Sequence, residues 1–469
     1  MPACAAAAAL DSRFHHVHFI GIGGVSMSAL ACTLRAWGLR VSGSDRADSP
    51  ALQAMRAQGL ATCVGQCADH LGDADLVVYT TAIAADNPEL VAARARGLTL
   101  WHRSELLAAV LADRQRLAIA GTHGKSSTTS MVATVLAELG QDPTLFVGGV
   151  ARNFGSNYHL GRGGWAVFEA CESDGSFLAY GGCCQVVTSI EPDHLDQHGT
   201  VENLIQAFRD FVATADPQGF VVHAASPPLV AEVASGSPAR CVSYGLTGPA
   251  DYQACQVSRD DSGIRFTPMV RGQALRPVSL QVIGDHNIRN ALAALAVAVE
   301  LGHDPEASAQ ALAAYRGVER RFERLGQVEG WEVFDDYAHH PTEIEVTLRA
   351  ARQHYGRRLL VIFQPHLYSR TKDLLAEFGR AFGDADLVVI ADIYAAREQP
   401  RDDISSAALH RLVQQHNPGK PVVYLPCFEA IEAFVRETAQ PDDLVLTMGA
   451  GDIRKVGESL VRTRAVTAA

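Results

Sequence analysis

The sequence predicts an α/β protein of three domains, each built on a largely parallel sheet. Along the 469 residues, strand-length apolar runs alternate with helix-length amphipathic stretches, a pattern typical of open parallel sheets covered by helices. A chain of this length also exceeds what one hydrophobic core usually serves. We place the domains at residues 1–108, 109–325 and 326–469.

The first segment has the pattern of a nucleotide-type α/β unit. An apolar strand at residues 16–20 leads into the glycine-rich turn 21–24, and a helix-like stretch follows. Further strands are expected at residues 41–45 and 75–79. Residues 1–10 are apolar but lack a basic n-region, so we expect a frayed tail and no signal peptide.

The second and third segments continue this alternation. In the second segment, strands are expected at residues 117–120, 165–169 and 185–190, an antiparallel insertion at about 243–280, and a closing helix at 287–301. In the third segment, buried strands are expected at residues 331–334, 358–363, 386–391, 422–425 and 443–447.

The turn after the strand at 117–120 has the composition of a phosphate-binding loop. It consists of Gly121, Thr122, His123, Gly124, Lys125, Ser126 and Ser127. In such a turn the backbone N–H groups and the helix N-terminus surround a phosphate, the lysine neutralises it, and the serine hydroxyl can reach Mg²⁺. The loop is shorter than the usual P-loop, so a purely structural turn is the alternative. Its place between an apolar strand and a helix favours ATP binding.

Acidic and histidine side chains follow two further strands of the second segment. Because the carboxyl ends of parallel strands meet at one edge, we expect these side chains beside the phosphate-binding turn. An isolated acidic residue is most often a solvated loop residue, but the clustering makes Glu169 and His194 candidate metal ligands. The two groups are Glu169, Glu172 and Asp174, and Glu191, Asp193, His194 and Asp196.

The turn at residues 21–24 resembles a dinucleotide fingerprint in which Ser26 replaces the third glycine. Either it binds a diphosphate or it is a tight strand-to-helix turn. Asp45, after the second strand, could accept a bond from a ribose hydroxyl, which keeps an NAD-dependent enzyme among the candidates.

Polar residues also follow two strands of the third segment, at 335–341 and 364–371. Arg370 is suited to hold a carboxylate by a two-pronged pair. For Asp336 and Thr342 the alternative is helix capping.

The composition narrows the class of partner and the compartment. The formal net charge of -12 argues against a surface that holds a nucleic-acid backbone. The ten cysteines form no CxxC pair, which favours reduced thiols. No apolar run approaches the roughly 20 residues needed to span a bilayer, so we expect a cytoplasmic protein without a membrane partner.

Twelve spaced motifs together resemble the Mur ligase family over essentially the full chain. They are HFIGIGG, VSGSD, TTAIAADNPE, AGTHGKSS, ESDGSF, IEPDHLD, GDHNIRNALAA, RRFERLG, DDYAHHPTE, FQPHLYSRT, DIYAAREQP and GAGDI. The resemblance implies a Rossmann-like N-terminal domain for the UDP group, a central P-loop ATPase-type domain, and a Rossmann-like C-terminal domain for the amino acid.

The activity that the resemblance implies is ATP-dependent ligation of L-alanine to the carboxylate of UDP-N-acetylmuramate, in peptidoglycan precursor synthesis. The carboxylate would take the γ-phosphate of ATP, and the amine would attack the resulting acyl phosphate. A monomer or weak homodimer is expected.

The resemblance also implies residue roles. Lys125, Glu169 and His194 are the implied catalytic residues, with Ser126, Glu169 and His194 as Mg²⁺ ligands. Asn287 and Asn290 would face the adenine, and Arg321 would reach toward phosphate. Gly23, Gly24, Ser44, Asp45 and Thr81 are expected at the sugar nucleotide, and Tyr337, His339 and Arg370 at the alanine.

Cys171 and Ser189 depart from the family pattern, which usually has aspartate and asparagine there. Three alternatives remain: a related ligase that recycles a tripeptide onto the same sugar nucleotide, an NAD oxidoreductase, and a non-catalytic nucleotide-binding regulator. The oxidoreductase leaves GTHGKSS unexplained, and the regulator would be expected to lack Lys125, Glu169 and His194.

Overall fold

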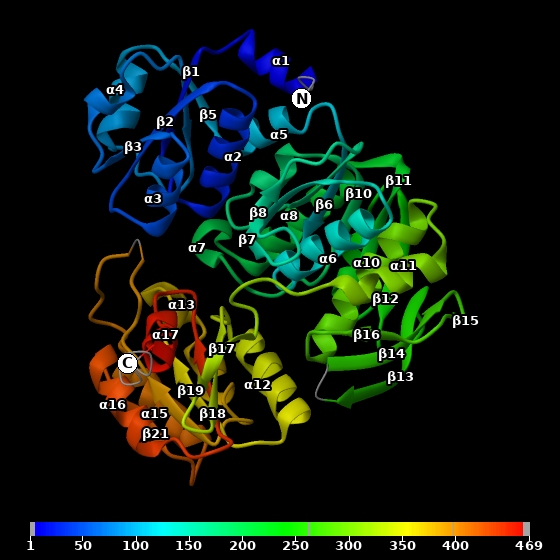
Figure 1. The fold of residues 1–469 in the computed structure, drawn as a ribbon, viewed down its shortest axis with the longest axis vertical. Coiled ribbons are helices and arrows are strands. Elements are labelled where there is room, and N and C mark those ends of the chain that lie inside the picture. Colours follow the sequence, from blue (N-terminus) through cyan, green and yellow to red (C-terminus); the bar gives the residue numbers. More distant parts are fainter. Residues whose placement is uncertain (1–4, 261–262, 397, 463–469) are drawn as a thin grey trace, which may run out of the picture. The chain divides into compact units, whose positions relative to one another are not determined.

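The computed structural model describes residues 5–260, 263–396 and 398–462. Its three sheets with flanking helices confirm the predicted α/β class (Figure 1). The chain divides into two compact units. The first consists of residues 1–253, 269–275 and 290–314, and the second of residues 254–268, 276–289 and 315–469.

The N-terminal sheet is parallel, with strand order β3-β2-β1-β4-β5. All five residues of β1 are buried, as expected for the central strand of a covered parallel sheet. The N-terminal elements are α1 (Ala5–Asp11), β1 (His16–Ile20), α2 (Val25–Ala36), β2 (Arg40–Asp45), α3 (Pro50–Ala57), β3 (Ala61–Val64), η1 (Ala68–Leu71), β4 (Leu76–Tyr79), α4 (Pro88–Ala95), β5 (Thr99–His102) and α5 (Arg103–Val110).

The expected frayed tail is wrong for residues 5–10, which belong to α1; residues 1–4 lie outside the described part. Alanine has the highest helix propensity, and Leu10 buries its side chain together with Ala6 and Ala7. An apolar segment without a signal-peptide pattern here packs as an ordinary helix.

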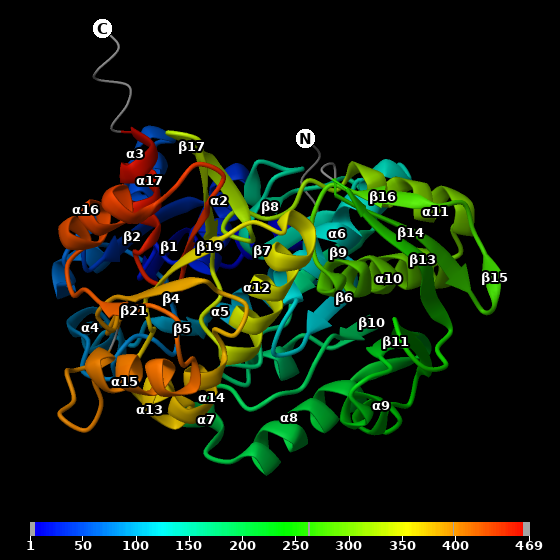
Figure 2. The same cartoon turned by 90° about the horizontal axis from the view of Figure 1, so that it is seen from below.

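The central sheet has the order β15-β14-β13-β12-β11-β10-β6-β9-β7-β8, and β16 pairs with β14. Figure 2 shows α8 and α9 on one face of it and α6 and α10 on the other. Its elements are β6 (Gln115–Ala120), α6 (Lys125–Glu138), β7 (Thr144–Ala151), β8 (Ser156–His159), β9 (Trp165–Glu169), η2 (Ser176–Ala179), β10 (Gly182–Val187), α7 (Leu195–His198), α8 (Val201–Ala213), β11 (Ala215–Ala224), α9 (Pro228–Ala234), β12 (Arg240–Gly245), β13 (Tyr252–Asp260), β14 (Gly263–Val270), β15 (Gln273–Ala274), β16 (Val278–Leu280), α10 (Asp285–Glu300), α11 (Pro305–Ala311) and η3 (Leu312–Ala314).

The topology of this sheet bears on two predictions, the antiparallel insertion and the shared edge at which the parallel strands end. β14 pairs antiparallel with β15 and β16, which confirms an antiparallel insertion. β12 pairs parallel with β11 and also with β13, so the antiparallel pairing in the described residues involves β14 and begins later than the predicted start at about residue 243. β6 lies between β9 and β10 and runs parallel to both. The carboxyl ends of these three strands therefore meet at one edge, as expected.

The C-terminal sheet has the order β17-β18-β22-β19-β20-β21, and β17 is its antiparallel edge strand. Each of the five predicted strands is present. Leu359, Val361 and Phe363 of β19 join one hydrophobic cluster, and Leu360 and Ile362 join another. Burial on both faces explains the continuous apolar runs. The elements are β17 (Glu323–Val328), β18 (Trp331–Asp336), α12 (Pro341–Tyr355), β19 (Leu359–Phe363), α13 (Tyr368–Asp373), α14 (Leu375–Arg380), β20 (Leu387–Ile390), α15 (Ser406–His416), β21 (Val422–Tyr424), α16 (Phe428–Thr438), β22 (Leu444–Met448) and α17 (Arg454–Arg462).

The predicted domain boundaries, after residues 108 and 325, fall inside α5 and β17. Both elements are regular and hydrogen-bonded, whereas domains usually meet at connecting segments. The domain boundaries themselves stay a prediction.

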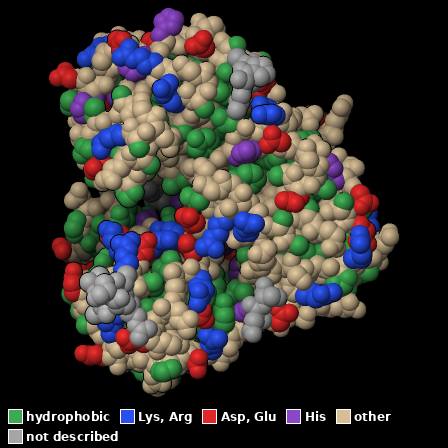
Figure 3. Space-filling model, in the orientation of Figure 1, with side chains coloured by type: hydrophobic (Ala, Val, Ile, Leu, Met, Phe, Trp, Pro, Cys, Tyr) green, Lys and Arg blue, Asp and Glu red, His purple; other side chains and the backbone are tan. Residues whose placement is uncertain are grey.

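Within the described residues, no helix is both long and apolar enough to cross a membrane. On the face drawn in Figure 3, acidic and basic side chains are interspersed with hydrophobic and uncharged ones.

Candidate functional site

The predicted phosphate-binding turn joins β6 to α6 and depends on two glycines. Gly121 has φ +136°, and a Cβ there would lie 2.1 Å from Thr188 Oγ1. Gly124 has a left-handed φ of +80° and precedes α6, where no side-chain cap is seen among the described residues. The first N–H groups of a helix without a cap can bind an anion, since the helix itself leaves them unpaired. These features are compatible with the predicted phosphate site, which stays a prediction.

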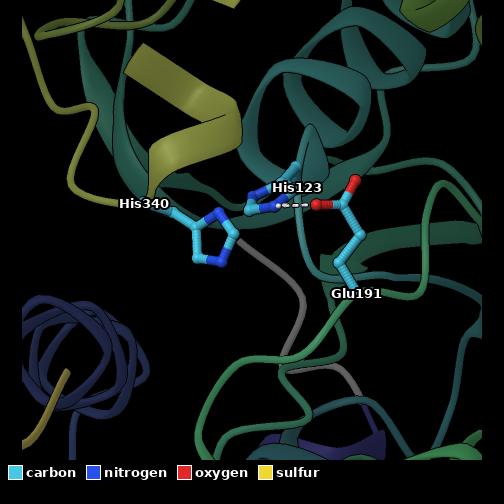
Figure 4. A group of neighbouring side chains, drawn as sticks. All are labelled: His123, Glu191 and His340. Carbon is cyan, nitrogen blue, oxygen red and sulfur yellow. Dashed lines mark ion pairs between the residues drawn. The ribbon is translucent and has the colours of Figure 1, made fainter. Parts of the chain in front are cut away.

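Hydrogen bonds fasten this turn to the segment that follows β10. Thr122 N donates to Ser189 O over 3.0 Å, and Glu191 N donates to Thr122 Oγ1 over 2.9 Å. His123 N donates to Ser189 Oγ over 2.9 Å. The His123 ring also lies near the Glu191 carboxylate, with Nε2 3.4 Å from Oε2 (Figure 4). The backbone of the turn is thereby fixed by residues far along the chain.

Lys125 begins α6, and its ammonium group contacts three oxygens. Nζ donates to Gly121 O over 2.5 Å, to Thr122 O over 3.2 Å and to Glu172 Oε1 over 2.9 Å. Burial alone would lower the pKa of Lys125, but the charge and hydrogen bond of Glu172, together with the charges of Cys171 and Glu169, outweigh burial and hold the pKa above its usual value. Lys125 is therefore a fully charged cation at the turn.

Glu169 ends β9, on the strand next to β6. Its Oε1 accepts a 2.8 Å bond from Gly148 N of β7. A Cβ at Gly148 would lie 2.9 Å from Oε2, so the glycine is what admits the carboxylate here. Glu169 thus offers a fixed carboxylate on the strand next to the phosphate-binding turn, which contains the Ser126 hydroxyl. Carboxylate and hydroxyl oxygens are ligands of the kind that Mg²⁺ prefers.

His194 precedes the short helix α7 and has a left-handed backbone, with φ +53°. Its Nε2 lies 3.6 Å from Asp193 Oδ2. The second metal site, proposed for His194 from the sequence, stays a prediction.

The two departures from the family pattern have clear contacts. Cys171 Sγ donates to Ser173 Oγ over 3.1 Å, and burial raises the pKa of this thiol. Ser189 accepts the His123 N–H bond described above. Ser189 thus supports the phosphate-binding turn.

The first glycine-rich turn is closed by Asp45. Gly23 N donates to Asp45 Oδ2 over 2.9 Å, and Arg46 N donates to Oδ1 over 2.7 Å. A Cβ at Gly23 would lie 2.6 Å from Leu52 Cδ1 and 2.8 Å from Asp45 Oδ2. Gly24 is the N-terminal cap of α2. Both oxygens of Asp45 hold backbone, so its predicted bond to a ribose hydroxyl would have to be an additional one.

Ser44 is completely buried, and its hydroxyl donates to Glu89 Oε2 over 2.6 Å. Glu89 is also completely buried and accepts from Cys67 N over 3.2 Å. The Ser44 hydroxyl is therefore already hydrogen-bonded to a buried carboxylate inside the N-terminal domain. Thr81, the other hydroxyl predicted at the sugar nucleotide, donates to Asp174 Oδ2 over 3.4 Å.

The two asparagines of α10 differ in their contacts. Asn290 is buried, and its Oδ1 accepts a 3.1 Å bond from Thr128 Oγ1 of α6. A Cβ at Gly124 would lie 3.0 Å from the same oxygen. Asn290 is therefore beside the phosphate-binding turn. Asn287 Nδ2 donates to Ile283 O over 2.8 Å.

In the second unit, the three residues predicted to bind the alanine substrate come together around His366. The Tyr337 and His339 rings meet edge to face with centroids 5.3 Å apart, and His339 and His366 lie 6.0 Å apart. Arg370 Nη1 lies 3.2 Å from His366 Nδ1. We call Tyr337, His339, His366 and Arg370 the arginine platform. It combines one buried guanidinium with aromatic walls, which suits a small carboxylate ligand.

Arg321 and Asp336 lie near this platform. The Arg321 guanidinium lies 5.4 Å from the Tyr337 ring centroid. Asp336 accepts 2.7 Å bonds from Phe322 N and Ala338 N, and burial raises the pKa of its carboxyl to about 6. The capping role considered for Asp336 is wrong, because His340 caps α12 by accepting from Thr342 N. Asp336 ties loops together instead.

Two buried carboxylates, Glu172 and Glu89, were not selected from the sequence. Glu172 was seen only as one of several loop acids, and nothing in its spacing indicates Lys125 as its partner. Glu89 follows an Asn-Pro pair that begins α4, where an acid normally complements the helix dipole. Its complete burial is the stronger signal, and only the structure gives it.

Three family models match the chain. They are described as Mur ligase family, catalytic domain, over residues 16–115, Mur ligase middle domain, over residues 119–298, and Mur ligase, glutamate ligase domain, over residues 320–451.

Two similar proteins are named UDP-N-acetylmuramate–L-alanine ligase. That of Pelotomaculum thermopropionicum is 45% identical and covers 95% of this chain and 97% of its own length. That of Kineococcus radiotolerans is 44% identical and covers 97% and 98%.

Solved structures of similar proteins are also ligases of this kind. The UDP-N-acetylmuramate-alanine ligase of Thermotoga maritima has a TM-score of 0.83 at 29% identity, covering 96% of this chain and 99% of that one. A murein peptide ligase from Psychrobacter arcticus has a TM-score of 0.72 at 26% identity, covering 95% and 98%. With relatives of this identity matched over nearly its whole length, the chain belongs to the Mur ligase family.

Proposed function

We propose that this protein joins L-alanine to the carboxylate of UDP-N-acetylmuramate at the expense of ATP. The observation that carries the proposal is Lys125 at the phosphate-binding turn, fixed by Gly121 and Thr122 and present on the same chain as the arginine platform. A cation for phosphate and a guanidinium for a small carboxylate are what an ATP-dependent amino-acid ligase needs. The similar proteins named above support the choice of sugar nucleotide and amino acid.

The first chemical step brings two anions together, so the turn must neutralise charge. A muramoyl carboxylate oxygen bonds to the γ-phosphorus while the bond to ADP breaks, giving an acyl phosphate. Lys125 and the N–H groups at the start of α6 offset the repulsion between carboxylate and phosphate.

In the second step the alanine amine attacks the acyl carbon. The tetrahedral intermediate expels phosphate and the nitrogen loses one proton, which leaves the amide. We assign the alanine carboxylate to Arg370, because a guanidinium can hold it by two parallel bonds and so fix the direction of the amine.

We further propose that Mg²⁺ accompanies ATP and that Ser126 and Glu169 hold it. The donor set fits, because Gly148 fixes one oxygen of Glu169 and leaves the other to a ligand. When bound, Mg²⁺ would neutralise phosphate charge. His194 is proposed for a second ion, and Asn287, Asn290 and Arg321 for the nucleotide.

The three predicted domains are proposed as working parts: UDP-sugar binding, ATP binding and amino-acid binding in that order. The amino-terminal turn at Gly23 and Gly24 would face the diphosphate, with Asp45 and Thr81 nearby. We propose a monomer or weak homodimer that works in the cytoplasm, where ATP is supplied.

Phosphate release tests the proposal. The protein is incubated with ATP, Mg²⁺ and UDP-N-acetylmuramate, together with alanine, glycine, serine or the tripeptide used by murein peptide ligases. We expect release with alanine and a product heavier by one alanyl residue. Turnover with the tripeptide and none with alanine would assign the chain to the recycling reaction instead.

A further inference from the structure

The loop at residues 170–175, between β9 and η2, binds two different parts of the first unit. Glu172 Oε1 lies 2.9 Å from Lys125 Nζ at the phosphate-binding turn. Asp174 Oδ2 lies 2.8 Å from Arg103 Nη2, at the start of α5 in the N-terminal domain. Two ion pairs, two residues apart in one short loop, thus connect the predicted ATP site to the predicted sugar-nucleotide domain.

The first pair occupies the donor that Lys125 would offer to a phosphate. An ammonium has three N–H donors. Two of them bond to the carbonyls of Gly121 and Thr122, which belong to the turn itself, and the third bonds to Glu172. A phosphate that binds Lys125 must share or replace the contact with Glu172.

Glu172 has little to stabilise it once that contact is lost. Its side chain is 2% exposed, and its Oε2 has no hydrogen-bond partner among the described residues. A buried carboxylate without a cation is strongly disfavoured. An incoming polyphosphate also repels it, since both carry negative charge. Glu172 therefore opposes phosphate binding unless the loop moves.

The second ion pair, between Asp174 and Arg103, attaches the loop to the N-terminal domain. Asp174 is 5% exposed at its side chain and accepts from Arg103 over 2.8 Å and from Thr81 over 3.4 Å. Its other oxygen accepts from Ser176 N over 3.1 Å. Thr81 follows β4 and Arg103 follows β5, at the carboxyl edge where we placed the sugar nucleotide. A ligand that engages Thr81 competes for the bond to Asp174.

We propose that Glu172 is a positioning residue that holds Lys125 in competition with nucleotide phosphate, and that the Asp174–Arg103 pair links release of this hold to the sugar-nucleotide site. The identity of the second ligand rests on the function proposed above. The benefit is chemical: the γ-phosphate becomes well bound only when the accepting carboxylate is present, so less ATP is lost to water.

The first test is Glu172→Gln, which keeps an oxygen for Lys125 to donate to and removes the charge. Calorimetric titration with the non-hydrolysable analogue AMP-PNP and Mg²⁺ should show binding tighter by on the order of tenfold. Glu202→Gln, the same change on an exposed glutamate of α8, is the matched control and should bind like the wild type. A folding defect weakens binding, so it cannot imitate this result.

The second test measures coupling. In the wild type, saturating UDP-N-acetylmuramate should tighten AMP-PNP binding by on the order of tenfold. In Glu172→Gln this factor should fall to about one, since the penalty is already gone. In Asp174→Asn the factor should also fall to about one, while AMP-PNP alone binds as it does to the wild type.

Unchanged or weaker AMP-PNP binding by a folded Glu172→Gln protein would overturn the proposal. Were that variant unable to fold, Asp174→Asn decides, because retained coupling there overturns the link and lost coupling supports it. A wild type that does not bind UDP-N-acetylmuramate would contradict the proposed function instead. The comparison of Glu172→Gln with the wild type needs no sugar nucleotide and keeps the two failures apart.

Discussion

Replacing Asp336 by asparagine should change how the stability of the second unit depends on pH. Asp336 is buried at the end of β18, and its pKa rises from the ordinary 3.8 to about 6. Burial is the main cause, and the charge of Arg321 and the N–H groups of Ala338 and Phe322 oppose it only in part. Asparagine keeps the size of the side chain and removes the titration.

The sign follows from the raised pKa. A carboxyl with a raised folded-state pKa contributes stability that is complete below its unfolded pKa and lost as pH rises through its folded pKa. With values of 3.8 and about 6, the wild type gains about 1.4 kcal/mol in free energy of unfolding between pH 8 and pH 5. The variant gains nothing from this site. On going from pH 8 to pH 5, the difference in free energy of unfolding between the two proteins therefore shifts by that amount in favour of the wild type.

The free energy of unfolding is measured in urea at pH 8 and at pH 5. Hydrogen exchange of the β18 and β22 peptides serves as the probe, so that the measurement reports on the unit that contains Asp336. Other titrating groups cancel in the comparison of the two proteins. Asp402→Asn, on an exposed aspartate of the same unit, is the control. A difference between wild type and Asp336→Asn that stays constant from pH 8 to pH 5 would refute the reasoning.

Three further substitutions test the site. Lys125→Ala should abolish phosphate release and also lower the free energy of unfolding by roughly 3–5 kcal/mol, because it leaves Glu172 buried without a cation. Adding Glu172→Gln should restore the Tm but not the activity. Glu169→Ala should raise the Mg²⁺ concentration needed for half-maximal rate, and an unchanged metal titration would assign the ligand elsewhere. Arg370→Lys should raise KM for alanine about tenfold or more, since one ammonium cannot replace a two-pronged pair, while AMP-PNP affinity stays the same; a loss of AMP-PNP affinity would argue against the assignment to alanine.

The parts of the fold that were predictable are those with strong apolar patterns. The C-terminal strands are buried on both faces, so each reads as a continuous hydrophobic run. β3 and β5 were not identified, because they are short strands at the two edges of the N-terminal sheet and none of their residues is fully buried. β11 contains Pro217 and Gly219, which are typical of turns, and was not identified either.

The site was predictable where chemistry is encoded in consecutive residues. The glycines and Lys125 of the phosphate-binding turn form such a motif, and their predicted location after β6 is confirmed. Contacts between distant segments were not predictable. The pairing of Glu172 with Lys125 and of Ser44 with Glu89 depends on how loops and helices approach each other, and neither spacing nor composition specifies that.

The hydrogen bonds that fasten the phosphate-binding turn have a consequence for how this protein is made. His123 and Thr122 bond to residues 66 and 69 positions later in the chain. At roughly 5–20 residues per second, a ribosome needs about 3–14 s to add those residues. During that interval the nascent chain carries the whole glycine-rich motif without the partners that shape it, and Asn290, which bonds to Thr128, follows 162 residues after it. The turn can therefore take its hydrogen-bonded shape only after these later residues have been synthesised.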